Sequence, residues 1–116
     1  MTDIAQLRPY QKKIMVKVKI LEKNEPREVT SRLDDTQHSV TEAFVADNTG
    51  AILLTLWDQD IEKFELNKCY EIENGYTSLF KNSLRMNVGR FGTSKEVPDI
   101  GEINRENNLS TAKEEN

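Results

Sequence analysis

The sequence predicts a small all-β domain, and three observations support that prediction. The chain has 116 residues, which is enough for one domain with a single core. Several short segments alternate apolar and polar residues with a period of two, as half-buried strands do. Helical spacing of apolar residues is confined to one short amphipathic segment in the middle of the chain.

Residues 14–21 give the clearest strand signal. Ile14, Val16, Val18 and Ile20 would share one face, and β-branched residues favour extended backbone. Weaker versions of this pattern predict four further strands, at residues 40–46, 51–57, 69–74 and 84–88.

The connections between these strands differ in length and character. Residues 47–50 read Asp-Asn-Thr-Gly and predict a tight turn, so the strands on either side should form a hairpin. Residues 22–39 are polar and lack periodicity, which fits a long loop or a hairpin extension of the flanking strands. Residues 58–64 predict a short helix with Asp58 as its N-cap. Residues 75–83 predict a loop.

Five strands with one short helix between the third and the fourth follow the element order of the OB-fold, a partly open Greek-key barrel. A β-sandwich would need about seven strands. In an OB-fold, strands two and three and the loops 1–2 and 4–5 bind oligonucleotides. We therefore expect an OB-fold domain at residues 1–97. Residues 98–116 are polar and acidic, and predict a disordered, flexible tail.

The charges are distributed unevenly along the chain. The formal net charge of −4 would by itself argue against nucleic acid as a partner. By segment, residues 1–33 sum to +4, residues 34–78 to −8, residues 79–95 to +4 and residues 96–116 to −4. The first 95 residues are therefore neutral overall. Residues 79–95 contain no acid and are suited to contact phosphates.

Several classes of protein are excluded by what the sequence lacks. No apolar run approaches the ~20 residues of a membrane helix, and the N-terminus does not read as a signal peptide. The single cysteine, Cys69, is expected to be a small buried residue in a reducing compartment. We expect a cytoplasmic protein, associated with the nucleoid, or a nuclear one in a eukaryote.

No set of residues suggests catalysis. His38 is the only histidine and is expected to be solvent-exposed in a polar loop. The chain has no His/Cys cluster for zinc, no nucleophile–histidine–acid set and no glycine-rich phosphate loop. The sequence therefore predicts a binding protein without a metal or cofactor, rather than an enzyme.

Trp57 is the most informative single residue. If Ile52, Leu54 and Leu56 face the core, strand parity puts Trp57 on the outer face. There it could stack on a base. Alternatively, it ends the strand and covers the mouth of the barrel beneath the short helix. Parity alone leaves both interpretations open.

A second group combines aromatic rings and cations. Tyr76 and Phe80 are followed closely by Lys81, Arg85 and Arg90. Flat rings stack on unpaired bases while cations neutralise phosphates, so this cluster favours single-stranded nucleic acid. Either ring alone could instead anchor the loop to the core.

Further contacts are expected from residues with weaker signals. Arg27 and Arg32 lie in the segment between the first two strands, where they could hold a nucleic-acid backbone or be solvated. Residues that parity places on the outer face add candidate contacts: Phe44, Leu53, Thr55 and Asn87.

Four motifs together carry a family resemblance over residues 5–97. They are Asp47-Asn48-Thr49-Gly50, Leu54-Thr55-Leu56-Trp57, the run from Glu71 to Lys81 and the run from Leu84 to Arg90. With them, the chain resembles the single-OB-fold single-stranded DNA-binding proteins of archaea and their eukaryotic relatives, of the replication protein A type. The resemblance implies that Trp57, Tyr76 and Phe80 stack on bases. Asn87 stands where some relatives carry a fourth aromatic residue.

From these features we expect a monomer that binds single-stranded DNA with little sequence preference. By resemblance, it would protect that DNA in replication, repair or recombination and could meet replication or repair proteins through its tail. Two alternatives remain open. The chain could be an RNA-binding OB module, or an adaptor whose aromatic residues anchor a protein partner.

Overall fold

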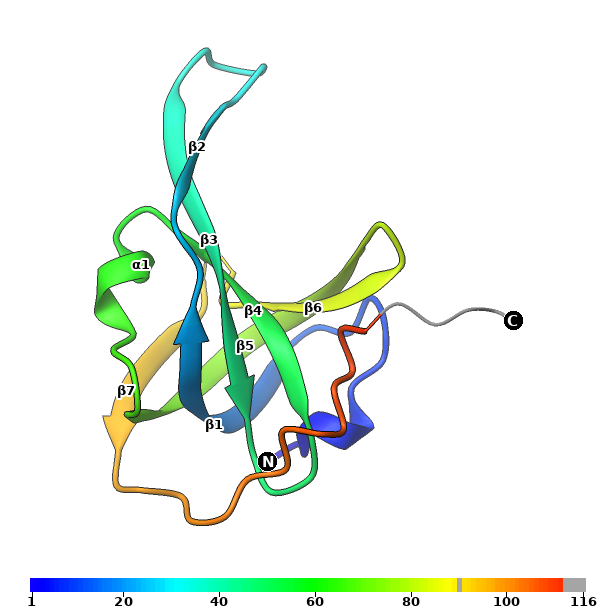
Figure 1. Ribbon diagram of the computed structural model, residues 1–116. Coiled ribbons are helices and arrows are strands. Elements are labelled where there is room, and N and C mark those ends of the chain that lie inside the picture. The colour runs from blue at the N-terminus through cyan, green and yellow to red at the C-terminus, as the bar shows by residue number, and fades with distance from the viewer. Residues whose placement is uncertain (90, 112–116) are drawn as a thin grey trace.

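The computed structural model describes residues 1–89 and 91–111 (Figure 1). A 3-10 turn, η1 (Ile4–Gln6), precedes the sheet, and one short helix, α1 (Asp60–Lys63), interrupts it. Within these residues the strands are β1 (Ile14–Lys23), β2 (Arg27–Thr30), β3 (Gln37–Ala46), β4 (Ala51–Trp57), β5 (Cys69–Phe80), β6 (Ser83–Asn87) and β7 (Thr93–Val97).

Five of these strands form a closed ring. The order is β1-β3-β4-β6-β5, and β5 pairs with β1 to complete the circuit. The β4–β6 pairing is parallel, with Leu53 opposite Arg85, whereas the other pairings of the ring are antiparallel. The ring strands are the five that the sequence predicts, and α1 lies between the third and the fourth of them. The expected all-β OB-fold is therefore confirmed.

The core lies inside the ring, on the faces that alternation predicts. Ile14, Val16, Val18 and Ile20 of β1 are all 4% exposed or less. Phe64, just after α1, is fully buried and packs edge-on against Tyr70, with 4.8 Å between the ring centroids. Cys69 is buried and free, as expected.

Residues 22–39 form a hairpin extension rather than an open loop. β2 pairs with the first half of β3, from Arg27 opposite Val40 to Thr30 opposite Gln37. In Figure 1 this hairpin projects upward from the ring. The α1 region also differs in detail, because its N-cap is Gln59 rather than Asp58.

The predicted loop at residues 75–83 is wrong. β5 continues to Phe80 and pairs with β6, so that the turn contains only Lys81 and Asn82, both with positive φ (52° and 67°). Two residues of this conformation match the twist of a hairpin. The sequence does not show a strand's alternation of apolar and polar residues here, because the polar Thr77 points inward and the aromatic Tyr76 points outward. A second hairpin therefore projects from the ring, and it holds both predicted aromatic residues (Figure 1).

The C-terminal segment corrects a second prediction. Residues 104–111 are not a disordered tail, because they are hydrogen-bonded to the ring. Ala51 N–H donates to the carbonyl of Asn107 and Leu109 N–H to that of Ala51, both at 2.8 Å. Ser110 is 5% exposed; its Oγ accepts from Leu53 N–H at 2.8 Å and donates to the Leu84 carbonyl.

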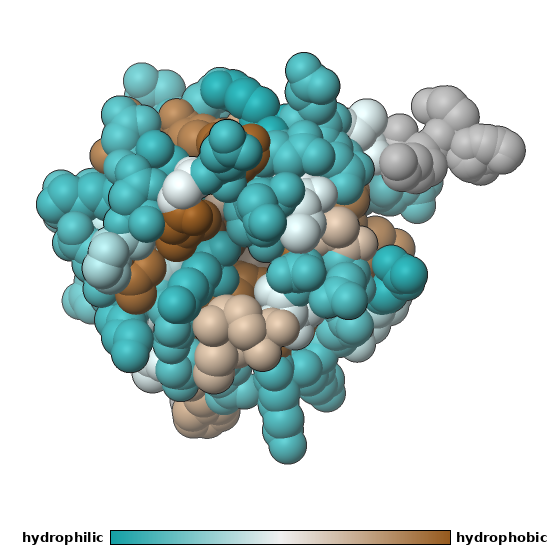
Figure 2. Space-filling model, turned by 90° about the horizontal axis from the view of Figure 1, so that it is seen from below, coloured by the Kyte–Doolittle hydropathy of each residue, from teal (hydrophilic) through white to brown (hydrophobic). Residues whose placement is uncertain are grey.

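The face seen from below in Figure 2, opposite the β2–β3 hairpin, is mostly hydrophilic, with small hydrophobic patches between the polar side chains. Among the described residues, no helix has the length and apolar character required to cross a membrane.

Candidate nucleic-acid interface

A groove of about 370 Å³ lies between the two hairpins. The β2–β3 hairpin lines one side of it with residues that include Arg27 and Val29, and the β5–β6 hairpin lines the other with residues that include Phe80 and Arg85. Thr55 and Trp57 of β4 also contribute. This is the surface that an OB-fold uses for oligonucleotides, the face of strands two and three together with the loops 1–2 and 4–5.

All three predicted stacking residues line this groove. Trp57, Tyr76 and Phe80 are 46%, 40% and 50% exposed. Trp57 is therefore on the outer face, not buried beneath α1, and neither of the other rings is tucked into the core. Large half-exposed rings gathered in a concave surface are available to stack on flat ligands.

His38 supports Trp57 from the neighbouring strand. The two rings meet edge to face, with centroids 6.4 Å apart. The His38 Nδ1 lies 2.8 Å from an oxygen of Asp58, and its Nε2 lies 2.9 Å from Thr36 Oγ1. The hydrogen bond with His38, followed by that from Ser39 N–H, lowers the pKa of Asp58. Sequence reasoning missed this arrangement, because Asp58 looked like a helix cap and His38 like a solvated loop residue.

Within the groove, two arginines contact one carboxylate. Arg27 donates to both oxygens of Glu42, at 3.2 and 3.0 Å, and Arg85 lies 3.5 Å from one of them. The hydrogen bond from Arg27 lowers the pKa of Glu42 and raises that of Arg27. Two cations therefore share one negative charge and leave a net positive site. The sequence alone did not indicate Glu42 as part of the interface.

Two cationic groups, Lys81 and the same Arg85, lie near the ring of Phe80. Lys81 Nζ is 5.4 Å and the Arg85 guanidinium carbon 5.2 Å from the centroid of its ring. Both distances are within cation–π range. The predicted pairing of aromatic and basic residues is thus physically assembled at this end of the groove.

The remaining predicted contacts divide into two groups. Thr55 and Asn87 line the groove, and Asn87 Nδ2 donates to Ser78 Oγ at 3.0 Å. Phe44 and Leu53 pair with each other but do not line it. They lie beside the C-terminal segment instead: the Arg105 guanidinium is 5.7 Å from the Phe44 ring, and Ser110 binds the Leu53 backbone.

Two predicted backbone contacts, Arg32 and Arg90, are not among the described residues that line the groove. Arg32 is exposed at the tip of the β2–β3 hairpin and does not line the groove. Arg90 lies outside the described residues. Within residues 1–89 and 91–111, no group of three or more His, Cys, Asp or Glu side chains is arranged so that it could hold a metal ion.

The fold and the groove together define an OB-fold binding protein. A family profile described as single-stranded DNA binding protein Ssb-like, OB fold, matches residues 7–96. The chain therefore belongs to the Ssb-like family of single-stranded DNA-binding proteins. The members of this family are binders, not enzymes, as the sequence predicts.

A curated relative and several solved structures are similar to the chain. It is 30% identical over 98 residues to the single-stranded DNA binding protein Ssb of Saccharolobus solfataricus. That alignment covers 84% of this chain and 65%, just under two thirds, of the relative.

Solved structures share the fold at lower identity. A hypothetical protein of Arabidopsis thaliana has a TM-score of 0.81 at 22% identity, covering 99% of this chain and 86% of that one. The replication factor A related protein of Methanobacterium thermoautotrophicum has a TM-score of 0.70 at 18% identity, covering 88% and 94%. A chain of a replication protein A heterotrimer bound to single-stranded DNA has a TM-score of 0.71 at 16% identity, covering 90% of this chain and 26% of that one.

Proposed function

We propose that this protein binds single-stranded DNA with little sequence preference through the groove between its two hairpins. Bases would stack on Trp57, Tyr76 and Phe80, because every base has a π-face. Arg27 and Arg85 would contact phosphates from the two sides of the groove. The observation that carries the proposal is three half-exposed rings in one groove whose cations outnumber its acids.

The contacts have expected magnitudes. Stacking contributes about 1–3 kcal/mol per base, so three rings would dominate the affinity. Phosphate contacts from Arg27, Arg85 and Lys81 would give a slope of log affinity against log salt no steeper than about −2, at ~0.7 per contact. The slope should be shallower than this limit in the wild type, because Glu42 partly neutralises the two arginines. Duplex DNA would bind poorly because its bases are already stacked on one another.

The biological role we propose follows from the family. As a monomer, the protein would cover and protect exposed single strands during replication, repair or recombination. Protein partners, if they bind the C-terminal region, would meet a segment whose residues 104–111 are already packed on the ring.

A fluorescence titration with oligo-dT tests the proposal. Trp57 is the only tryptophan, so its emission reports one site. We expect oligo-dT to change the emission, with weaker binding at the higher of two salt concentrations. Binding of Trp57→Ala, measured by anisotropy of a labelled oligonucleotide, should be weaker by about 1–3 kcal/mol. Leu66→Ala removes an exposed apolar side chain outside the groove and should bind normally.

Two results would contradict the proposal. The stacking assignment fails if saturating oligo-dT leaves the Trp57 emission unchanged and Trp57→Ala binds as the wild type does. The assignment to DNA fails if RNA of the same sequence displaces the labelled oligonucleotide as well as DNA does or better, since stacking alone does not distinguish the two sugars.

A further inference from the structure

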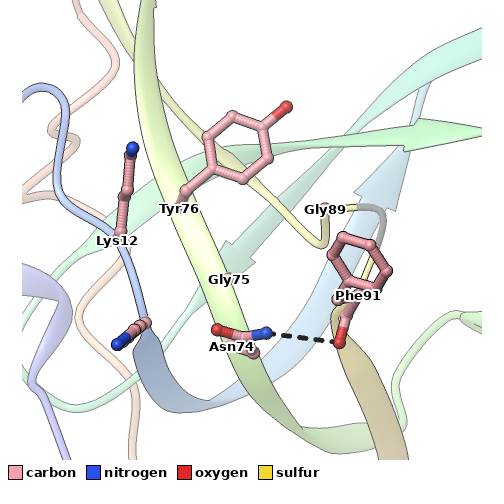
Figure 3. A pocket seen from close by; sticks show the side chains of 7 residues that line it. Lys12, Asn74, Gly75, Tyr76, Gly89 and Phe91 are labelled. Carbon is pink, nitrogen blue, oxygen red and sulfur yellow. Dashed lines mark hydrogen bonds between the residues drawn. The ribbon is translucent and has the colours of Figure 1, made fainter.

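A second hollow opens on the far side of Tyr76 from Phe80. It has a volume of about 370 Å³, within the ~300–1,000 Å³ typical of ligand sites. Figure 3 shows it over residues Asn74 to Tyr76 of β5, with Lys12 on one side and Phe91 on the other. We call this the Phe91 hollow.

The side chains of the Phe91 hollow are suited to a nucleotide. Phe91 is 76% exposed, so its ring is accessible to a base. Lys12 and Lys13, both exposed, contribute two ammonium groups from the segment that precedes β1. None of the described residues lining the hollow is acidic. Asn74 Nδ2 donates to the Phe91 carbonyl at 3.4 Å, which links the loop carrying this ring to β5.

The Phe91 hollow adjoins the groove. Tyr76 lines both. Gly89 lines the hollow and also a smaller depression that contains Trp57 and Asn87. A strand stacked on Trp57 and Tyr76 would therefore meet this hollow next if it continued along the surface.

We propose that the Phe91 hollow is a further nucleotide subsite, which takes one base on the Phe91 ring and the adjoining phosphate on Lys12 and Lys13. This inference rests on the proposed function, because it extends the same bound strand by one position. With this subsite, the protein would cover a longer stretch of single-stranded DNA than the three rings of the groove alone would cover.

The test compares two lengths of oligo-dT: one of about three nucleotides, which the three rings of the groove can hold without the Phe91 hollow, and one of about twelve, within the range covered by single OB-folds. Phe91→Ala should weaken binding of the longer oligonucleotide by about fivefold or more and leave the shorter one unaffected. Trp57→Ala should weaken both. Lys12→Gln with Lys13→Gln should make the salt slope for the longer oligonucleotide shallower by up to ~0.7, because the two lysines neutralise one phosphate. Lys63→Gln with Lys68→Gln removes two charges from residues that line neither the groove nor the hollow, and is the charge-matched control.

A fluorophore at the site gives an independent readout. In a Trp57→Phe/Phe91→Trp double variant, the only tryptophan reports the hollow. We expect its emission to change with the longer oligonucleotide and not with the shorter one.

The two possible failures are distinguishable. If Trp57→Ala is weaker at both lengths, while Phe91→Ala binds like the wild type and a tryptophan at position 91 does not respond, the groove binds DNA but the subsite is refuted. If wild-type protein binds neither oligonucleotide, the proposed function itself fails.

Discussion

Glu42 controls the charge of the groove at the scale of a single residue. Its side chain is 11% exposed and contacts the guanidinium groups of Arg27 and Arg85. In the free protein these arginines are thus partly neutralised by a carboxylate in the position that a phosphate would take. The same carboxylate would repel the phosphates that approach it.

Glu42→Gln should therefore tighten binding of oligo-dT at low salt, because both arginines then present their full charge. The salt dependence should also steepen, by at most ~0.7 for each arginine released. Titrations of the wild type and the variant at several salt concentrations measure both effects. Glu62→Gln on α1 changes the net charge equally, away from the groove, and should have little effect. Weaker binding by Glu42→Gln would show instead that Glu42 positions the arginines.

Gly89 limits the orientation of Tyr76. Its φ is +87°, and a Cβ at this position would lie 3.1 Å from Tyr76 Cδ1. Gly89→Ala should cost about 1–3 kcal/mol of stability through backbone strain and should also displace the stacking ring, which lowers affinity for oligo-dT. Gly101 has a similar φ of +90° with open space around it. Gly101→Ala should therefore lose stability without losing affinity; equal affinity losses in both variants would exclude a specific effect on Tyr76.

At the scale of elements, the sequence predicted strands whose two faces differ in polarity. β1 and β4 alternate because one face is buried, and their limits were close to those observed. The second half of β5 was missed because its inward Thr77 is polar and its outward Tyr76 and Phe80 are aromatic. Period-two patterns detect a difference in polarity between the two faces of a strand, so the second half of β5, with a polar inward residue and aromatic outward ones, does not produce one.

The grouping of aromatic and basic side chains was predicted better than the backbone element that carries them. Aromatic and basic residue types indicate stacking and phosphate contacts whether the backbone is a loop or a strand. Glu42 and His38 were missed because their roles depend on cross-strand partners, Arg27 and Asp58, that no local pattern specifies.

The β2–β3 hairpin should loosen in acid. Arg27 on β2 lowers the pKa of Glu42 on β3 below its ordinary value of 4.5. A carboxylate with a depressed pKa stabilises the folded state above its unfolded pKa, and this contribution is lost as pH falls through the lower folded value. The wild type should therefore lose its advantage in unfolding free energy over Glu42→Gln as the pH falls below 4.5 and through the lower folded pKa of Glu42.

Urea denaturation across this pH range measures that difference. Arg27→Gln is the matched variant, because it removes the partner that lowers the pKa of Glu42 and should flatten the same part of the profile. A difference between the wild type and Glu42→Gln that is constant with pH would contradict the assignment.

At the scale of the whole molecule, the C-terminal segment acts as part of the domain. It brings residues 104–111 back to β4 and to the start of β6, far from them in sequence. Its contacts are backbone hydrogen bonds and one buried serine, Ser110, with the partly buried Leu109 packed on the core. Polar contacts of this kind leave no hydrophobic period, which is why composition alone predicted disorder.

Removing residues 104–116 should therefore destabilise the ring. The truncation leaves Leu53 N–H and the Leu84 carbonyl without Ser110, and an unsatisfied buried group costs about 1–3 kcal/mol. We expect Tm to fall by about 4 °C or more. Removing only residues 112–116 retains these hydrogen bonds and should leave Tm nearly unchanged.

Both variants should bind oligo-dT like the wild type at a temperature where they are folded, because residues 104–111 do not line the groove. Equal Tm values for the two truncations would show that the segment does not stabilise the domain.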